Sequence, residues 1–480
     1  MPEINKKLNK TLELLAKSEY SDNVSISGLL DNDIENVVLQ YKGGRYLLTF
    51  REKFNKQLDD AFYRELRPFT LKTSFGELCV EGVDAAASYS INVDDCHMQF
   101  EVELHAFKSL KINKLNTCYY RFIIPIERED WLHDIATYTY RCENKIVKGL
   151  IDFHNQGQKH IHFYPVSVKE KKYLFIESQE KCTIKQMQDW MFAAVLSVGF
   201  FTGSLHMGEV FIVAFENGDF SDVIGLMYNR LRPSVKSIGS IFTTNMYSIH
   251  VRLEVNEKQH YAIDQLYKDG QFQPHLQDWL CEDTLCAMYS LLLDNEDVNR
   301  AVLTINEVMN LPLDYQGSIC SVLLENIARA LTKKRSKSKI TKRNWKTIAG
   351  WMNKNLAKAV SESLMPGECY NYMKNRVDGM NYLPNRDMLM APFIEKGYQL
   401  SQNEIDVIDL RNVFLHGDFP DGTPEEQREI IYYASCVFHR LCALLILKEI
   451  GFKGYITNNA TLLGCKKALE AHEPALIYVS

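Results

Sequence analysis

Short runs rich in β-branched and aromatic residues dominate the first half of the chain. They are NVVLQY (36–41), RYLLTF (45–50), MQFEVELHAF (98–107), CYYRFIIP (118–125), HIHFYPVSV (160–168), KYLFIES (172–178), EVFIVAF (209–215) and SIHVRLEV (248–255). Runs of this length and composition are typical of strands. One apolar segment has helical spacing instead, because Met187, Met191 and Val195 recur at intervals of four before Gly203. The pattern predicts a β-rich region over about 22–255 that one helix interrupts.

The pattern changes after Gly270 and Pro274, where apolar residues recur with the 3.6-residue period of amphipathic helices. The periodic segments are 276–294, 297–309, 316–332, 343–364, 403–416 and 424–450. The order of the two patterns predicts an α+β protein. We expect a β-rich N-terminal domain at 1–270, followed by an all-α helical bundle at 271–480. Because no Gly/Ser-rich linker separates them, we expect a short hinge near 256–275.

Composition is that of an ordinary globular protein. Of the 480 residues 46% are hydrophobic and 24% are charged, and the net charge is −6, which is not typical of disordered or strongly basic proteins. The first twenty residues are amphipathic and lack the apolar core of a secretory signal. The apolar stretch Trp190–Thr202 is shorter than the roughly 18 residues of a membrane span. The 12 cysteines include no C-x-x-C pair, which favours reduced thiols. We therefore expect a cytoplasmic protein.

Several well-known catalytic motifs are absent from the sequence. It contains no G-x-x-x-x-G-K-[ST], no G-x-G-x-x-G, no G-x-S-x-G and no H-E-x-x-H. His154, His160 and His162 lie close together, and two of them share a strand face. A metal site is one interpretation of these histidines. A structural role is the other, and we favour it because no Cys or carboxylate was identified beside them.

Two segments place an arginine five residues before a histidine: REDWLH at 128–133 and RNVFLH at 411–416. An arginine followed by a histidine after four to six intervening residues is expected about once or twice by chance in a chain of this composition. Two carboxylates follow the first arginine directly and would repel a phosphodiester. Asn412 follows the second, on a segment with an apolar helical face. Because Asn412 and His416 are four residues apart, a helix places them on one side. The second segment is therefore the candidate.

The stretch LRNVFLHG at 410–417 resembles the HEPN domain of the ApeA-like anti-phage defence proteins. It follows LPNRDMLMAPFIEKGYQLSQNEIDVIDL and precedes a helix with YYASCVFHRLCALLILKEIGF, and the resemblance covers about 277–455. The segment SICSVLLENIARAL resembles the first core helix of that family, which often carries an acidic residue at the place of Glu325. The β-rich half is loosely similar to the domain that precedes this HEPN domain.

The resemblance implies a ribonuclease site composed of Arg411, Asn412, His416 and Glu325, without a metal or another cofactor. In such a site the ribose 2′-hydroxyl attacks the adjacent phosphorus and leaves a cyclic phosphate and a 5′-hydroxyl. A histidine, with an ordinary pKa of about 6.5, can transfer protons, and an arginine can stabilise the phosphoryl oxygens. Asn412 can orient the imidazole or the phosphate. For Glu325 two roles stay open: a partner of Arg329, or a residue that holds Arg411 or His416.

Positive charge is concentrated in the helical half. Between Tyr315 and Val360 the chain has eleven basic residues against the single acid Glu325, a net charge of +10 in this window. The basic residues that we expect to contact RNA phosphates are Lys333, Lys334, Arg335, Lys337, Lys339, Lys342 and Arg343. A solvated basic loop is the alternative. Trp345 can stack on a base or anchor a helix to the core.

These inferences lead to a metal-independent endoribonuclease, a toxin-like effector of anti-phage defence by abortive infection. Its expected substrate is RNA, and tRNA loops are common targets of HEPN toxins. A catalytically silent HEPN adaptor for RNA or protein is the alternative, and a carbohydrate-binding sandwich rests on strand content alone. Because a free ribonuclease would kill its host, we expect the N-terminal half to restrain the site or sense a phage-derived trigger. HEPN domains generally dimerise, which implies a homodimer or even-numbered assembly, with no membrane partner.

Overall fold

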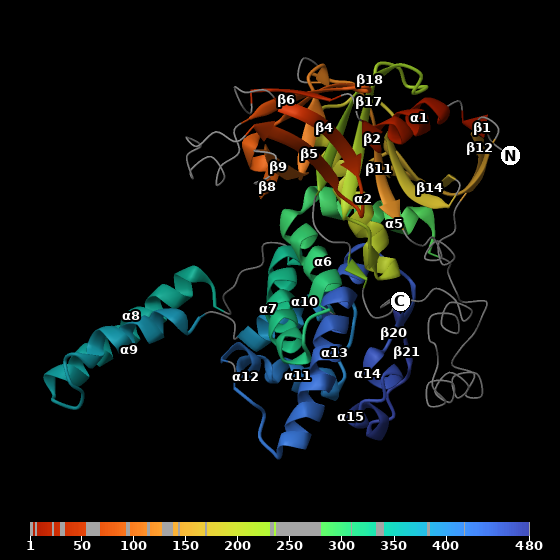
Figure 1. The fold of residues 1–480 in the computed structure, drawn as a ribbon. Helices are drawn as coiled ribbons and strands as arrows, with labels where there is room; N and C mark the ends of the chain where they lie inside the picture. The colour runs from red at the N-terminus through yellow and green to blue at the C-terminus, as the bar shows by residue number, and fades with distance from the viewer. Residues whose placement is uncertain are drawn as a thin grey trace. The chain divides into compact units, whose positions relative to one another are not determined.

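Figure 1 shows the computed structural model of the chain. It describes residues 3–4, 7–21, 24–28, 34–53, 68–92, 97–112, 116–126, 138–142, 145–168, 170–230, 235–236, 280–308, 310–332, 340–381, 385–416 and 418–479. The chain forms two compact units, Met1–Asn310 with Lys453–Thr457, and Leu311–Phe452 with Asn458–Ser480. Strands dominate up to Arg230 and helices follow from Glu282. The predicted α+β class, with its β-rich region first, is confirmed.

A twelve-stranded sheet forms the framework of the first unit. Its strands lie in the order β1-β12-β13-β14-β15-β11-β17-β18-β10-β7-β6-β3. Their bounds are β1 (Glu3–Ile4), β3 (Ser25–Ser27), β6 (Phe69–Thr73), β7 (Gly76–Val80), β10 (Ala106–Ser109), β11 (Tyr119–Ile126), β12 (Tyr138–Cys142), β13 (Lys145–Asn155), β14 (Gln158–Val168), β15 (Lys171–Ser178), β17 (Glu209–Phe215) and β18 (Val223–Arg230). Neighbours pair antiparallel, except β1 with β12. The central β11 and β15 are buried along most of their length, as their continuous apolar runs predict.

A second, five-stranded sheet shares a hydrophobic core with the first. Its strands, in the order β2-β4-β5-β9-β8, are β2 (Tyr20–Ser21), β4 (Ile34–Tyr41), β5 (Tyr46–Lys53), β9 (His97–Leu104) and β8 (Ala85–Asn92). Phe50 and Phe100 stack within this sheet at 4.9 Å. Together with Leu71 and Phe107 of the larger sheet, they form part of one hydrophobic core, as in a β-sandwich. The short strands β16 (Ser204–Leu205) and β19 (Val235–Lys236) form a separate pair.

A buried ion pair joins helix α1 (Asn9–Ser18) to the large sheet. Arg121 and Glu177 are both fully buried, and the Nε of Arg121 donates to the Glu177 carboxylate at 2.6 Å. Arg121 also donates to the carbonyl of Lys7 at 3.0 Å and to the hydroxyl of Thr11. Because a buried charge is tolerated only when it is paired and hydrogen-bonded, these contacts attach α1 at one place on the sheet.

Helix α2 (Ile184–Thr202) begins at a capping box formed by Thr183 and Gln186 and ends at Gly203, whose φ is +70°. Helices α5 (Glu282–Asp294) and α6 (Glu296–Val308) pack against α2, and α5 also packs against β13. These two helices therefore group with the sheets, although the sequence pattern assigned them to a helical domain at 271–480. The predicted boundary at 270 and the hinge at 256–275 lie outside the described residues.

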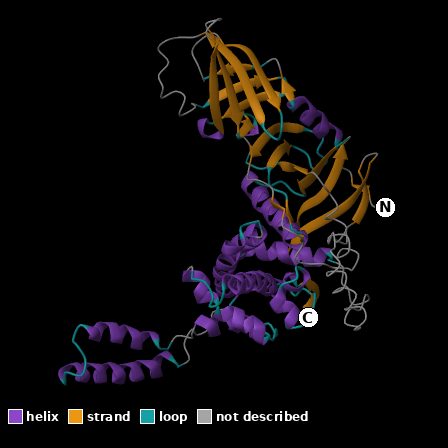
Figure 2. Cartoon of the chain, turned by 60° about the horizontal axis from the view of Figure 1, so that its bottom comes forward, coloured by secondary structure: helices purple, strands orange, loops and turns teal. Residues whose placement is uncertain are grey.

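In the part of the chain that the structure describes, the second unit consists of helices and a strand near the end of the chain. Figure 2 shows these helices in purple. They are α7 (Leu313–Leu331), α8 (Lys342–Ser361), α9 (Cys369–Gly379), α10 (Asn385–Glu395), α11 (Gln402–Asp409), α12 (Arg411–His416), α13 (Pro424–Glu449), α14 (Asn459–Leu462) and α15 (Lys466–Glu470), followed by β21 (Leu476–Val479). Strand β20 (Gly454–Thr457) belongs to the first unit. Helix α7 packs against α13, α12 and α10, and α8 packs mainly against α9.

Helix α13 is the central helix of this unit. It begins at a capping box of Thr423 and Glu426, with Pro424 at its first position. Among the described residues, α13 is the helix that is long and apolar enough to cross a membrane by length and composition, and 89% of its most apolar 18-residue stretch is buried within the protein. Its apolar surface is covered by neighbouring elements, as in a core helix.

Candidate functional site

The segment that carries Arg411 forms two helices, although the sequence pattern predicted one helix at 403–416. Helix α11 ends before Leu410, and α12 begins at Arg411. The backbone N–H of Leu410 lies 3.2 Å from the carbonyl oxygen of Asp406 and 3.1 Å from that of Val407. Such a shared bond tightens the last turn of a helix. After this break α12 packs on α7, and Arg411 is buried at its first position.

Arg411 forms an ion pair with Glu325 of α7. Its Nη2 donates to the Oε2 of Glu325, and the Oε1 of the same carboxylate accepts from the Nη2 of Arg329 at 2.9 Å. The side chains of Arg411, Glu325 and Arg329 are 10%, 32% and 64% exposed. Glu325 therefore makes both of the arginine contacts that the sequence left open as alternatives. Two guanidinium groups share one carboxylate, so the trio has a net positive charge.

Helix α12 approaches α7 closely because α7 has a glycine at the contact. A Cβ atom on Gly317 would lie 2.7 Å from the Cε1 of Phe414 and 2.9 Å from the Oγ of Ser435. Phe414 also packs edge-on against Phe438, with ring centroids 5.8 Å apart. The hydroxyl of Ser318 donates to the carbonyl of Phe414 at 3.2 Å. Gly317 thus allows α12, the helix that carries Arg411, to pack closely against α7 and α13.

Replacing Gly317 by alanine is expected to destabilise the protein. The added methyl group would overlap the ring of Phe414, and overpacking costs about 1–3 kcal/mol, whereas alanine gains roughly 1 kcal/mol over glycine in a helix. Gly350→Ala is the matched control, because no atom lies within 4 Å of a Cβ at that position in α8. Thermal unfolding followed by circular dichroism should give a lower Tm for Gly317→Ala and an unchanged or higher Tm for Gly350→Ala. A Gly317→Ala protein as stable as the wild type would contradict the close contact.

Asn412 and His416 lie on the same short helix as Arg411. Asn412 is exposed, whereas Arg411 before it and Phe414 two positions after it are buried. His416 is the last residue of α12, and its side chain lies outside the part that the structure describes. The predicted proximity of the Asn412 amide to the imidazole therefore stays a prediction.

Two of the seven basic residues predicted to contact RNA lie in the described part of the chain. Lys342 and Arg343 begin α8 and are both exposed. Trp345, two residues later, is half-buried. The other five basic residues lie outside the described part: Lys333, Lys334, Arg335, Lys337 and Lys339. The other arginine–histidine segment, 128–133, lies outside it as well.

The three histidines of the β-rich region have separate partners. The Nδ1 of His160 lies 2.9 Å from the hydroxyl of Tyr289, and burial lowers the pKa of His160. The Nε2 of His162 lies 3.9 Å from the carboxylate of Asp152, and the Nδ1 of His154 lies 3.3 Å from the Sγ of Cys286. The fold thus brings a carboxylate and a thiol to these histidines, contrary to the expectation from the sequence. Within the described ranges, no group of three His, Cys, Asp or Glu side chains could hold a metal ion. The contact of His160 with Tyr289 is typical of a structural role.

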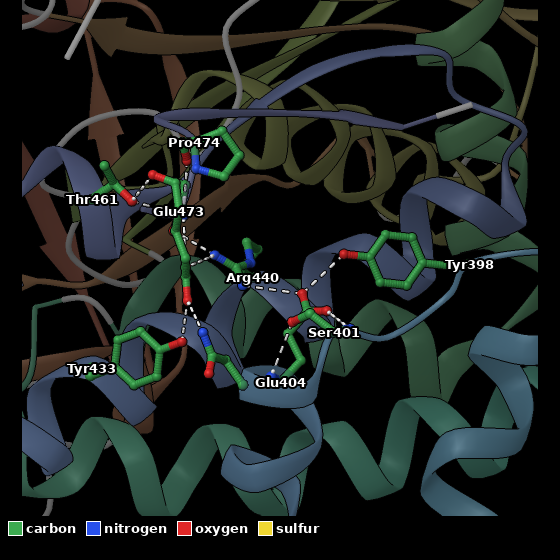
Figure 3. Close-up of polar contacts among 10 residues, drawn as sticks. Tyr398, Ser401, Glu404, Tyr433, Arg440, Thr461, Glu473 and Pro474 are labelled. Atoms are coloured by element: carbon green, nitrogen blue, oxygen red, sulfur yellow. Dashed lines mark hydrogen bonds and ion pairs between the residues drawn. The ribbon is translucent and has the colours of Figure 1, made fainter. Parts of the chain in front are cut away.

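A buried polar cluster on α11 and α13 was not identified from the sequence (Figure 3). Arg440 of α13 donates through Nη2 to the Oε1 of Glu404 at 3.1 Å and through Nη1 to the Oδ1 of Asn458. Its Nη1 also lies 3.6 Å from the Oε2 of Glu473. The side chains of Arg440, Glu404 and Glu473 are 5%, 3% and 12% exposed. Two carboxylates face one guanidinium group, so the three ionisable groups carry one net negative charge.

Further hydrogen bonds connect this cluster to the start of α11. Glu404 accepts from the hydroxyl of Tyr398 and from the backbone N–H of Ser401, both at 2.9 Å. Glu473 accepts from the hydroxyl of Tyr433. Burial and the adjacent carboxylates raise the pKa of Tyr398 and of Tyr433, so both phenols remain hydrogen-bond donors. The cluster therefore fixes α11, which leads directly into α12.

Part of this cluster has a signal in the sequence. Arg440 lies in the apolar run of α13, where an arginine requires a buried partner. Ser401 and Glu404 form the S-x-x-E pattern of a capping box. Glu473 has no comparable signal, because a glutamate in a polar segment near the end of the chain is usually solvated.

Comparisons of the chain with protein-family models, with curated proteins and with solved structures found no match. The proposals below therefore rest on the residues described above and on the resemblance of the α12 motif.

Proposed function

We propose that the protein is a metal-independent HEPN-type endoribonuclease of anti-phage defence. The observation that carries the proposal is the ion pair between Arg411 and Glu325. The two residues were selected from separate segments, 86 positions apart, and they meet across α7 and α12. Cleavage of a phosphodiester requires a cation held where negative charge develops. Glu325 supplies such positioning for Arg411.

In the proposed reaction the ribose 2′-hydroxyl attacks the adjacent phosphorus while the bond from phosphorus to O5′ breaks. A proton leaves the attacking hydroxyl and a proton is delivered to O5′, so the products are a 2′,3′-cyclic phosphate and a 5′-hydroxyl. His416 transfers one of these protons. Arg411 stabilises the charge on the phosphoryl oxygens, and Asn412 orients the phosphate or the imidazole. Glu325 is a positioning residue.

The hydrogen bonds of Arg411 also support this role. Its Nε is buried, and among the described residues it has no hydrogen-bond acceptor. This N–H is therefore available to a phosphoryl oxygen, although the structural arginines Arg121 and Arg440 also have a guanidinium nitrogen without an acceptor in the described part of the chain. The exposed Arg329, with the exposed Lys342 and Arg343, provides further positive charge in the same unit.

Purified protein and labelled RNA test the proposal. Cleavage should persist in EDTA and yield ends with a 5′-hydroxyl. Cleavage that stops in EDTA would contradict the metal-independent reaction. RNA binding without cleavage would instead favour the second candidate function.

That second candidate is a catalytically silent adaptor for RNA or protein, and the burial of Arg411 favours it. A guanidinium group that is 10% exposed and already paired with Glu325 offers little surface to a phosphate. In an adaptor the pair would serve only to hold α12 on α7. The two candidate functions predict different effects of the Arg411→Lys substitution on RNA cleavage.

The proposed partners are RNA, a second copy of the chain and a phage-derived trigger sensed by the first unit. In-line cleavage places the attacking and leaving oxygens on opposite sides of phosphorus, and one α12 presents its groups from one side. Two copies related by a twofold axis would supply both sides. We therefore propose a homodimer, or an assembly of dimers, with composite sites.

Mixing wild-type protein with an excess of His416→Ala protein is expected to lower the cleavage rate below simple dilution, because active subunits enter mixed dimers. The rate is measured on labelled RNA as the wild-type fraction decreases, and light scattering gives the mass. A rate proportional to the wild-type fraction, together with a monomeric mass, would exclude composite sites.

A further inference from the structure

Helices α8 and α9 form a hairpin with a closed base. The backbone N–H of Ile340 donates to the Oδ1 of Asn381 at 2.8 Å, and the Nδ2 of Asn381 donates to the carbonyl of Ile340 at 2.9 Å. Asn381 is buried. This two-way amide contact joins the chain two residues before α8 to the chain two residues after α9 and holds the two helices side by side (Figure 1).

The hairpin buries little of its own apolar surface. Among its described residues, Ala349 of α8 and Val377 of α9 are the buried hydrophobic side chains. Trp351, Tyr372 and Met380 are 69%, 60% and 61% exposed. Helices of this length gain most of their stability from packing of an apolar face, and contiguous exposed apolar surface usually marks an interaction site. The hairpin therefore has the surface of a bundle that lacks a further helix.

The exposed side chains line a groove of about 890 Å³ between the two helices. Its apolar lining includes Trp351, Met352, Leu356, Tyr372, Met373 and Met380. Arg376 is the charged residue in the lining, and its Nη2 donates to the hydroxyl of Tyr372 at 2.9 Å. Methionine side chains adapt to the shape of an apolar partner, and an aromatic and methionine-rich groove suits the apolar stripe of a helix.

The α8 side of the groove is basic, and Lys358 on this side also lies 3.5 Å from the carboxylate of Glu362 at the end of the helix. Helix α8 contains five basic residues and no acidic one. Lys354 and Lys358 are exposed and follow Trp351 by three and seven positions, so a helix places all three on one face. A partner that lays apolar residues on Trp351 therefore brings its flanking residues close to these ammonium groups.

We propose that this groove binds an amphipathic helix of a partner protein, with acidic residues flanking its apolar stripe. The helix would complete a three-helix unit with α8 and α9. Since α9 has 11 residues and α8 has 20, a partner helix of about three to five turns matches the groove. A single RNA strand fits less well, because the lining is mostly apolar and contains one cation. The proposal is independent of ribonuclease activity.

The test uses the full-length protein and three fluorescent probes, with binding measured by anisotropy. The first is a synthetic 16-residue helical peptide with a leucine stripe flanked by glutamates, the second has lysines in place of the glutamates, and the third is a 12-nucleotide polyuridine RNA. The glutamate peptide is expected to bind at least tenfold more tightly than the lysine peptide. Trp351→Ala should weaken this binding at least tenfold. Tyr315→Ala, which removes an exposed aromatic side chain of α7, should not.

Charge reversal gives the sharpest outcome. In the Lys354→Glu, Lys358→Glu protein the preference should shift towards the lysine peptide. Equal binding of the two peptides to the wild-type protein would overturn the proposal. A second contrary result would be binding of polyuridine, but not of the glutamate peptide, to the wild-type protein, together with loss of polyuridine binding in Trp351→Ala. That result would assign the groove to RNA. A mass by light scattering that halves in Trp351→Ala would overturn the proposal in favour of an interface between two copies.

Discussion

Alanine in place of His416 is expected to slow RNA cleavage by about 10²–10⁴-fold, the usual contribution of a general acid or base. Arg411→Ala is expected to lose about 10²–10³-fold, as on removal of a donor that stabilises charge in the transition state. Initial rates on labelled RNA measure both effects. Arg128→Ala and His133→Ala are matched controls, because they have the same spacing in the sequence. These controls should cleave at the wild-type rate, and a comparable loss in them would show that we chose the wrong segment.

A lysine at position 411 distinguishes a catalytic Arg411 from a structural one. Lysine keeps the positive charge and can still pair with Glu325, but it cannot bind a phosphate in the two-pronged manner of a guanidinium group. The ribonuclease proposal therefore expects Arg411→Lys to keep a Tm close to that of the wild type while cleavage falls. Full activity in Arg411→Lys, or a loss of activity that merely follows a lower Tm, would assign Arg411 to holding α12 on α7.

Methionine in place of Arg440 is expected to destabilise the protein by about 3–5 kcal/mol. Removing one partner of a buried ion pair leaves an uncompensated charge, and here Glu404 and Glu473 would both lose the cation that they share. Their bonds to Tyr398 and Tyr433 would remain, but neutral hydroxyl groups do not balance two carboxylates. Urea unfolding followed by circular dichroism measures the change.

Two further variants make the stability prediction specific. Arg428 lies on the exposed start of the same helix, so Arg428→Met should stay within roughly 0.5 kcal/mol of the wild type. Combining Arg440→Met with Glu404→Gln and Glu473→Gln removes the carboxylate charges and should recover part of the loss. If Arg428→Met and Arg440→Met were equally stable, the cluster would not be the stabilising feature that its geometry indicates.

The strands were predictable where the sequence has a continuous apolar run. All predicted runs from 36 to 215 are strands, with 98–107 divided at His105 into β9 and β10. The run at 248–255 lies outside the described residues. Strands β13 and β18 were missed, although β18 begins with the apolar run VIGLMY. Strand β8, with the sequence AAASYSIN, was not predicted because small and polar residues have weak strand preferences. It forms because β9 pairs with it along its whole length, and local sequence does not contain that information.

For the helices, too, local sequence predicts the elements better than their packing. Periodicity located α7, α8 and α13 to within a few residues, but it did not show that α5 and α6 pack with the sheets. The break at Leu410 was missed because the contact of α12 with α7 depends on Gly317 in a distant segment. In the candidate site, Glu325 and Arg411 could be named from the sequence because each lies in a recognisable motif. Which arginines contact Glu325 could be determined only from the folded structure.

The lengths of the edge strands affect how the protein would behave at high concentration. At the edges of the large sheet β1 has two residues and β3 has three, and β2 at one edge of the small sheet has two. Such short edges offer few free backbone groups to a strand of another molecule. The opposite edge of the small sheet is β8, with eight residues and no further strand beside it among those described. Aggregation by strand pairing between molecules would therefore begin at β8. Introducing a lysine on that edge is the direct way to improve solubility.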